Sequence, residues 1–245
     1  MRRPTVTAVC LTADRQAYTD RAVQSFLEQT YENSRLLIYD TGKKPYSMER
    51  LASGRIALIR AEDAPNRTIG ALRNEAHRHA ETEVLIHWDS DDWSAPYRIE
   101  DQVRLLVISN ADIVGYNDLL FWDSLKSEAW VYRHPSHKYP IGTSLCYWRK
   151  FWDTHPFQGT SAGEDFHFVH GQRTSACTSM QSYGDDPGLT AAWKPMLVAE
   201  IHGGNTHAKV SPDKLEWKRE TGWDGRLKEL MGMRPPAIER KDWAG

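Results

Sequence analysis

The stretch Val84-Leu-Ile-His-Trp-Asp-Ser-Asp-Asp-Trp93 decides the fold of this chain. Its first half is a short apolar run typical of a buried strand, and three carboxylates follow within four residues. Neighbouring carboxylates repel each other strongly unless a cation neutralises them. Acids at the end of a buried strand therefore indicate an α/β sheet with a hard-cation site at its edge.

The alternative for this acidic cluster is the start of the following helix. Asp92 stands four residues before Pro96, so it could cap a helix that has this proline in its first turn. That accounts for one acid, at most two, but not for three after an apolar strand. If strand geometry continues, Asp89 and Asp91 fall on the same side, where Mg²⁺ or Mn²⁺ could bind them together with substrate phosphates.

Strands and helices alternate through about the first 115 residues. Strands are expected at 5–11, 36–39, 56–59, 84–88 and 112–116, and helices at about 18–29, at 69–80 and from near 96 onward. This order predicts an α/β fold with a mainly parallel sheet and helices on both faces. Ligands bind such sheets beyond the carboxyl ends of the strands, so Thr12–Arg15, Asp40–Gly42 and Asp89–Asp92 should converge on one rim.

The second half of the chain is less regular. Strands are expected at 119–122, 129–132, 143–148 and 196–201, and helices at 164–170, 213–220 and 226–231. No linker composition splits the chain, so we predict a single domain over residues 1–245. It would comprise a donor half of about 1–115, an acceptor half of about 116–210 and a helical C-terminal extension of about 211–245.

The bulk composition is that of a soluble globular protein, with 40% apolar and 26% charged residues. A net charge of −2 means that no overall field attracts the chain to nucleic acid or to a membrane. Three cysteines argue against a disulfide framework and indicate a reducing, cytoplasmic location. No apolar stretch reaches the roughly 18 residues of a membrane span, so any membrane contact is expected to be peripheral.

Six segments, in this order, resemble the family 2 inverting glycosyltransferases of GT-A fold. They are Val9-Cys-Leu-Thr-Ala-Asp-Arg15 with the helix 22–31, Leu37-Ile-Tyr-Asp-Thr-Gly42, Gly70-Ala-Leu-Arg-Asn-Glu-Ala76, Asp89-Ser-Asp-Asp-Trp93 with 96–103, Gly163-Glu-Asp165, and His202-Gly-Gly-Asn-Thr206. The chain departs from the family pattern in two places. Leu11 and Ala13 stand where proline and an aromatic residue are usual, and Asp40 is the only acid at the end of the second strand.

The resemblance implies a nucleoside diphosphate sugar as donor and inverting transfer of a hexosyl group to an acceptor hydroxyl. The donor contacts that it implies are Thr12, Asp14, Arg15, Asp40, Arg73, Asn74 and Asp89. It implies Mn²⁺ or Mg²⁺ as cofactor, with Asp91, Asp89 and His202 as metal ligands. Such a metal would bridge the diphosphate and stabilise it as a leaving group.

The resemblance assigns the catalytic base to Asp165, with Glu164 orienting the acceptor or the loop. Inverting transfer needs one base to take the proton of the acceptor hydroxyl while its oxygen attacks the anomeric carbon. The alternative is a pair of first-turn acids that the helix dipole favours.

The other site residues have alternatives as well. Asp40 could form a turn with the glycine two residues later. Arg73 and Asn74 could lie on a solvated helix face, although the guanidinium fork suits the oxyanions of a donor. His202 and His207 could belong to an ordinary polar loop; of the two, we favour His202 as the ligand.

Aromatic side chains are numerous, with ten tryptophans. Trp93, Trp148 or Trp152 could line an acceptor cleft, and core packing is the alternative for each. His77 and His79 stand two residues apart on a predicted helix, so they do not share a face. We interpret both as surface residues.

Two other functions share the expected scaffold. A nucleotidyltransferase would also use paired acids and a metal, but no glycine-rich basic loop follows the first strand to hold a triphosphate. The second alternative is a non-catalytic binding module.

The class of acceptor stays open among a glycan, a lipid-linked sugar, a protein, a small molecule and a modified nucleic-acid base. Basic and aromatic residues do interleave at 130–138 and 148–152, which suits a nucleic-acid groove and a sugar cleft equally. The oligomeric state is not predicted.

Overall fold

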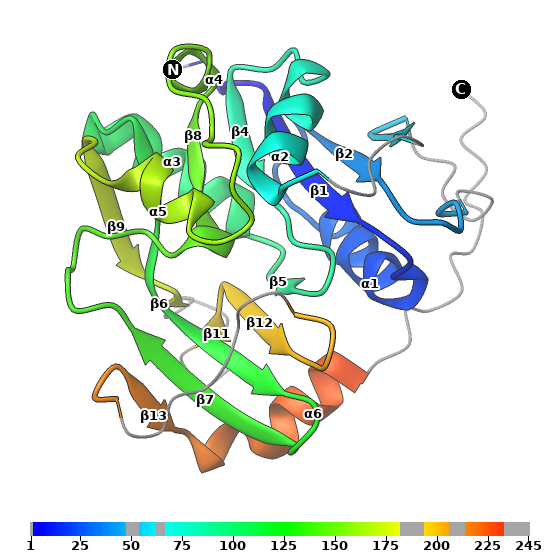
Figure 1. Ribbon diagram of the computed structural model, residues 1–245. Coiled ribbons are helices and arrows are strands. Elements are labelled where there is room, and N and C mark those ends of the chain that lie inside the picture. The colour runs from blue at the N-terminus through cyan, green and yellow to red at the C-terminus, as the bar shows by residue number, and fades with distance from the viewer. Residues whose placement is uncertain (1, 48–53, 62–66, 182–193, 206–213, 233–245) are drawn as a thin grey trace.

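The computed structural model describes residues 2–47, 54–61, 67–181, 194–205 and 214–232, and a curved sheet runs through them (Figure 1). Eleven strands of the described residues form this sheet. They are β1 (Val6–Thr12), β2 (Ser34–Asp40), β3 (Ile56–Arg60), β4 (Val84–His87), β5 (Trp93–Ser94), β6 (Ile113–Asp123), β7 (Glu128–Arg133), β8 (Cys146–Trp148), β9 (Thr174–Thr178), β12 (Leu197–Ile201) and β13 (Trp217–Arg219). Two short strands, β10 (Met180–Gln181) and β11 (Lys194–Pro195), pair separately.

The sheet is parallel in its first part and mixed beyond it. Its main path runs β13-β7-β6-β8-β4-β1-β2-β3, and β4, β1, β2 and β3 are parallel neighbours. The short β8 pairs antiparallel with both β4 and β6, and so joins the two parts. β12 and β9 pair parallel with β6 off the main path. The strands and helices predicted for the first 115 residues are therefore present in the predicted order, with one addition, the two-residue strand β5.

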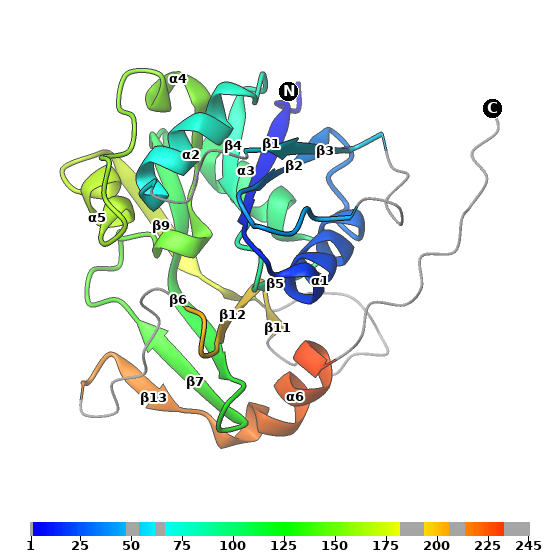
Figure 2. The ribbon, with the colours of Figure 1, turned by 45° about the vertical axis from the view of Figure 1, so that its right-hand side comes forward.

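Helices cover both faces of the parallel part, as predicted. They are α1 (Gln16–Leu27), α2 (Ile69–Arg78), α3 (Arg98–Ser109), α4 (Arg149–Trp152) and α5 (Glu164–Val169). A further helix near the described C-terminal end, α6 (Asp224–Gly232), packs on β6, β7 and β12 instead. Because side chains alternate along a strand, Ala8 and Cys10 of β1 face α1 and α3, whereas Val9 between them faces α2, α4 and α5. Figures 1 and 2 show α1 and α2 on opposite sides of β1.

The second half differs from the prediction in its strands. One continuous strand, β6, spans 113–123, where two short strands were expected, and β9 was not expected at all. All eleven residues of β6 are buried, because β7, β8, β9 and β12 pair along its edges and its apolar side chains join core clusters on both faces. Such a strand, buried on both faces, has little of the polar alternation that a prediction relies on.

The helix expected over 213–220 is wrong for its described part. Trp217–Arg219 form the edge strand β13, which pairs antiparallel with β7. The pairing places Trp217 opposite Tyr132 and packs its indole against Phe121. Burial of a large ring against a neighbouring strand thus overrides the local helical preference. Elsewhere, none of the described helices is long and apolar enough to cross a membrane.

Candidate active site

The carboxyl ends of β1, β2 and β4 meet at one rim of the sheet, as predicted. Thr12 at the end of β1 lies beside Asp40 at the end of β2, and the acidic segment follows β4 on the other side of β1. A cavity of about 680 Å³ opens at this rim. Its lining includes Thr12, Arg15, Thr41, Arg73, Asp89, Ser90, Asp91, Asp92, Phe121, Tyr132, Ile141, Gly142, Thr143, Ser161, Glu164, Asp165, Ala199, Glu200, Asn205 and Trp217.

Asp91 is the centre of a polar cluster at one side of the cavity. One of its carboxylate oxygens, Oδ2, lies 2.9 Å from Arg15 Nη1, 2.9 Å from His202 Nε2 and 3.3 Å from Asn205 Nδ2. The predicted ligands Asp91 and His202 are therefore in direct contact, although 110 residues separate them in the chain. Asn205, for which no role was predicted, also donates a hydrogen bond from Nδ2 to Glu200 O and so holds the loop in place.

The surroundings of His202 define which of its nitrogens donates. The backbone N–H of Gly204 donates to Nδ1 at 3.0 Å, which leaves the Nε2 proton for Asp91. The imidazole also stacks on Tyr18, with 4.5 Å between ring centroids. Burial raises the pKa of Asp91, but the hydrogen bond from His202 and the charge of Arg15 outweigh it and hold this pKa below its usual value. Asp91 is thus a carboxylate at neutral pH.

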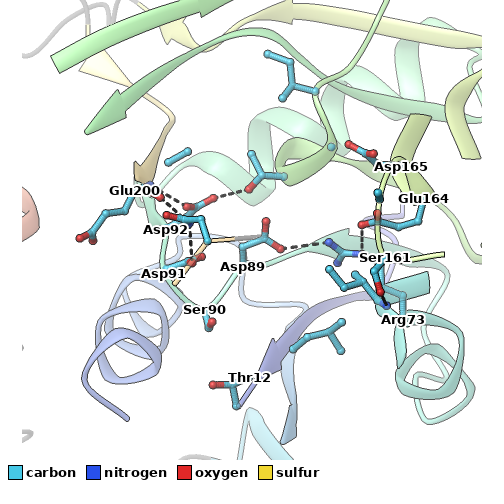
Figure 3. A pocket seen from close by; sticks show the side chains of 18 of the residues that line it. Thr12, Arg73, Asp89, Ser90, Asp91, Asp92, Ser161, Glu164, Asp165 and Glu200 are labelled. Carbon is cyan, nitrogen blue, oxygen red and sulfur yellow. Dashed lines mark hydrogen bonds and ion pairs between the residues drawn. The ribbon is translucent and has the colours of Figure 1, made fainter. Parts of the chain in front are cut away.

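Arg73 lies between two acids on the opposite side of the cavity (Figure 3). Its guanidinium is 3.5 Å from Asp89 Oδ1 and 3.6 Å from Glu164 Oε1, and it is almost fully buried. Nε and Nη1 are buried and make no hydrogen bond with the described residues, and Nε is the atom that faces Glu164. Burial raises the pKa of Glu164, an effect that Arg73 opposes and Asp165 strengthens. The helix-face alternative for Arg73 is therefore wrong.

Asp92 has a structural role rather than the helix-cap role considered above. Its carboxylate accepts hydrogen bonds from the backbone N–H of Glu200 at 3.1 Å and from the hydroxyl of Thr143. These contacts join the acidic segment to β12 and to the turn before β8. Burial, with the charges of Asp91 and Asp89, raises the pKa of Asp92 well above its usual range.

Asp165 enters the cavity from the first turn of α5, and two glycines make room for it. A Cβ on Gly142 would stand 1.9 Å from Asp165 Oδ2, so only glycine lets the carboxylate lie over this position. A Cβ on Gly70 would meet Gln158 O at 1.9 Å, so Gly70 admits the loop that leads to α5. The other oxygen, Oδ1, accepts the N–H of Phe166 at 2.8 Å.

Three residues of the expected donor set do not line the cavity. Asp40 accepts hydrogen bonds from the backbone N–H groups of Gly42 and Tyr46 and from the side chain of Arg60. Asp40 therefore forms the turn with Gly42 that was the alternative to donor binding. The amide of Asn74 is engaged with Trp152 and with the backbone of Phe157. Asp14 is exposed and accepts from Lys44 N, which lowers its pKa. Direct donor contacts by these three stay predictions.

The tryptophans considered for an acceptor cleft pack elsewhere. Trp148 and Trp152 belong to the core beneath α2, and Trp93 packs between β12 and the α6 region. Instead, Phe121, Tyr132 and Trp217 line the cavity. Aromatic residues alternate along 130–132, and this pattern indicates that they share one face of a sheet. Whether that face is directed toward the cavity depends on how β6, β7 and β13 pair.

His77 is fully buried, so its interpretation as a surface residue is wrong, whereas His79 is exposed. Four residues after Arg73, His77 lies on the same helix face and points into the sheet. Its Nδ1–H donates to Arg73 O, and Nε2 accepts from the hydroxyl of Tyr147. His87 on β4 donates from Nδ1 to Gly142 O at 2.8 Å. Burial lowers the pKa of both imidazoles, so both are neutral, and their hydrogen bonds hold Arg73 and Gly142 in place beneath the site.

Because these histidines are buried and neutral, we expect the protein to lose stability in mild acid. Burial lowers the pKa of His77 to about 3, below its value of 6.5 in the unfolded chain, so the unfolded state binds the proton first as the pH falls. The stabilisation is complete above about pH 6.5 and is lost toward pH 3, by about 1.4 kcal/mol per pH unit for this group. We expect urea unfolding between pH 7 and 5 to show a shallower pH dependence in His77→Phe. The exposed His155→Phe is the control, and equal slopes in both variants would contradict the assignment.

The cavity carries a strong excess of negative charge. Six carboxylates and two guanidinium groups line it among the described residues: Asp89, Asp91, Asp92, Glu164, Asp165 and Glu200 against Arg15 and Arg73. Glu200 is paired with Arg21, which is not part of the lining, and the pKa values of Asp92 and Glu164 are raised. Even without these three acids, Asp89, Asp91 and Asp165 outnumber the two guanidinium groups. Within the described residues, no three His, Cys, Asp or Glu side chains are placed to hold a metal ion by themselves.

Comparison with known proteins places this architecture in a family. Residues 7–169, well over half of the chain, match the model of Glycosyl transferase family 2. The chain belongs to this family. The resemblance seen in the six sequence segments is therefore confirmed, and the family assignment favours a glycosyltransferase over a nucleotidyltransferase. A search of curated proteins found no match.

Solved glycosyltransferase structures share the fold. TarS 1-349 of S. aureus in complex with UDP-GlcNAc superposes with a TM-score of 0.58 at 13% identity, covering 85% of this chain and 62% of that one. Mannosyltransferase PcManGT from Pyrobaculum calidifontis, in complex with GDP-Man and Mn²⁺, gives 0.55 at 14% identity and covers 73% and 55%. This chain therefore spans less than two thirds of either, and the similarity confirms the GT-A fold.

Proposed function

We propose that this glycosyltransferase moves a sugar from a nucleoside diphosphate sugar to an acceptor hydroxyl, with inversion and with a divalent metal at Asp91 and His202. One observation carries the proposal: Asp91, in contact with His202, and Asp165 line the same cavity at the carboxyl end of β4. A metal-dependent leaving-group site and a carboxylate base are the two parts that such a transfer needs.

Asp91 and His202, with Asp89 at the same cavity, would hold a divalent ion of the Mg²⁺ or Mn²⁺ type. A hydrogen bond of 2.9 Å now joins Oδ2 of Asp91 to Nε2 of His202, so the ion would take the place of the Nε2 proton. Two protein ligands suffice, because Mg²⁺ and its relatives take their remaining ligands from substrate phosphates and water. The bound ion would neutralise charge on the departing diphosphate.

The charge of the cavity supports the same conclusion. A diphosphate that enters a site with more carboxylates than guanidinium groups is repelled unless a cation accompanies it. Arg15 and Arg73 are each held by acids of the site, so neither is an isolated anion receptor. A divalent ion would reduce this excess of negative charge, and Arg73, which lines the cavity, would then donate to the donor sugar or phosphate.

The transfer itself would need one proton acceptor from the chain. The acceptor oxygen bonds to the anomeric carbon, the bond from that carbon to the diphosphate oxygen breaks, and the hydroxyl proton passes to the Asp165 carboxylate. Glu164, held by Arg73, would keep the α5 turn in place. Residues of about 1–115 would bind the donor and those after them the acceptor. A cytoplasmic location, with any membrane contact peripheral, stays a prediction.

Thermal unfolding of the native chain with nucleoside diphosphates, each with and without Mn²⁺, tests the donor site. We expect one diphosphate to raise the unfolding midpoint only when Mn²⁺ is present. The gain would be about 2.7 kcal/mol at a hundredfold excess over the dissociation constant. A shift with triphosphates alone would favour the nucleotidyltransferase. No shift with any nucleotide would contradict the proposed function.

A further inference from the structure

We propose that the aromatic wall of the cavity, formed by Phe121, Tyr132 and Trp217, binds a neutral sugar ring, so that the acceptor is an uncharged carbohydrate. The inference rests on the proposed transfer and adds the chemical class of its acceptor. All three side chains line the cavity that contains Asp91 and Asp165.

The three rings share one face of the sheet because of how their strands pair. Leu119 of β6 is opposite Tyr132 of β7, and Tyr132 is opposite Trp217 of β13, so these side chains point the same way. Phe121, two residues after Leu119, points to that face as well. The ring centroids of Phe121 and Trp217 are 4.9 Å apart and those of Tyr132 and Trp217 are 5.0 Å apart.

The opposite face of these strands is already covered. Leu120 of β6 and Val198 of β12 pack there against Leu227 and Met231 of α6. Figures 1 and 2 show α6 beside β6 and β7, below the α/β part of the molecule. The aromatic face has the cavity in front of it, and Tyr132 and Trp217 are only partly buried. Their rings are therefore available to a ligand.

The aromatic wall and the proposed base line the same cavity, and two consecutive residues connect them. Ile141 packs against the cluster that contains Phe121, and the next residue, Gly142, lies directly beneath the Asp165 carboxylate. A sugar seated on the wall would thus have its hydroxyls near Asp165. This is the arrangement that deprotonation of an acceptor hydroxyl requires.

The chemistry of the wall selects for an uncharged sugar. A sugar ring has a face of weakly positive C–H groups that packs on the negative face of an aromatic ring, and hydroxyls at its edge that donate to carboxylates. A phosphorylated acceptor would be repelled, because the guanidinium groups of the described lining residues, Arg15 and Arg73, are paired with acids. A lipid tail would find six carboxylates in the same cavity.

Saturation-transfer NMR tests the proposal without a donor. The probes are methyl glucoside, methyl galactoside, methyl mannoside, cellobiose, lactose and N,N′-diacetylchitobiose, with glucose 6-phosphate and octyl glucoside as charged and lipid-like comparators. We expect signal from at least one neutral probe and about tenfold weaker binding of it by Trp217→Ala. Tyr132→Ala is a second variant in case the first fails to fold. Trp223→Ala, outside this cavity, should bind as the native chain does.

The other outcomes would overturn the proposal. They are signal from glucose 6-phosphate alone, signal from octyl glucoside but no neutral sugar, no signal from any probe, or binding that the wall variants leave unchanged. The thermal shift with Mn²⁺ and a diphosphate separates the two proposals. If that shift is present and neutral sugars do not bind, only the acceptor class is wrong. If that shift is absent, the proposed transfer itself is wrong.

Discussion

Replacement of Asp165 with asparagine is expected to lower the turnover rate of sugar transfer by about 10²- to 10⁴-fold, the usual contribution of a general base. Asparagine cannot take the acceptor proton, but its amide oxygen can still accept the N–H of Phe166, as Oδ1 does now. The fold and the donor site should therefore persist. Initial rates of transfer, with the metal-dependent thermal shift measured on the same samples, check this prediction.

Two variants make the result specific. Asp153→Asn changes an exposed acid at the end of α4 and should transfer at the native rate. Gly142→Ala keeps Asp165 but introduces a Cβ 1.9 Å from its Oδ2, so the carboxylate must move. A displacement of about 1 Å can cost about 10²-fold in rate, and we expect a loss of that order. Native rates in Asp165→Asn would mean that another group is the base.

Replacement of Asp91 with asparagine is expected to abolish the metal-dependent part of nucleotide binding and, with it, transfer. The Oδ2 atom of Asp91 accepts from Arg15, His202 and Asn205, and its low pKa keeps it charged. An amide removes the charge that a hard cation needs. The Mn²⁺-dependent gain in stability, about 2.7 kcal/mol at a hundredfold excess of nucleotide, should disappear.

Titration of Mn²⁺ by its electron paramagnetic resonance signal measures the loss directly, without turnover. The native chain with the diphosphate should bind the ion, Asp91→Asn should not, and Asp153→Asn should bind as the native chain does. Retained Mn²⁺ binding in Asp91→Asn would show that the metal ligands lie elsewhere. An unchanged nucleotide shift without any metal would show that Arg15 and Arg73 bind the diphosphate alone.

The part of the site formed by the acids after β4 could be predicted, because the local sequence pattern and the sheet topology place these acids at the same rim. Asp89 and Asp91 follow an apolar strand, and parallel strands place their carboxyl ends at one rim. Asp40 also follows an apolar strand, yet Tyr46 and Arg60 engage its carboxylate. Asn74 was expected from the resemblance alone, and Trp152 engages its amide. A sequence shows that a polar side chain is present, but its partners decide whether it can reach a ligand.

The sequence alone determined the α/β class and the rim of this protein, because strand and helix periodicities and strand-end acids are local properties. The family was indicated by the resemblance of six segments to known glycosyltransferases. Only the tertiary structure decided the rest. The contact of Asp91 with His202, the burial of His77 and the orientation of Phe121, Tyr132 and Trp217 all depend on pairing between distant segments. A local pattern cannot encode which strand edge or loop a side chain will meet, because that choice follows from burying the most apolar surface across the whole chain.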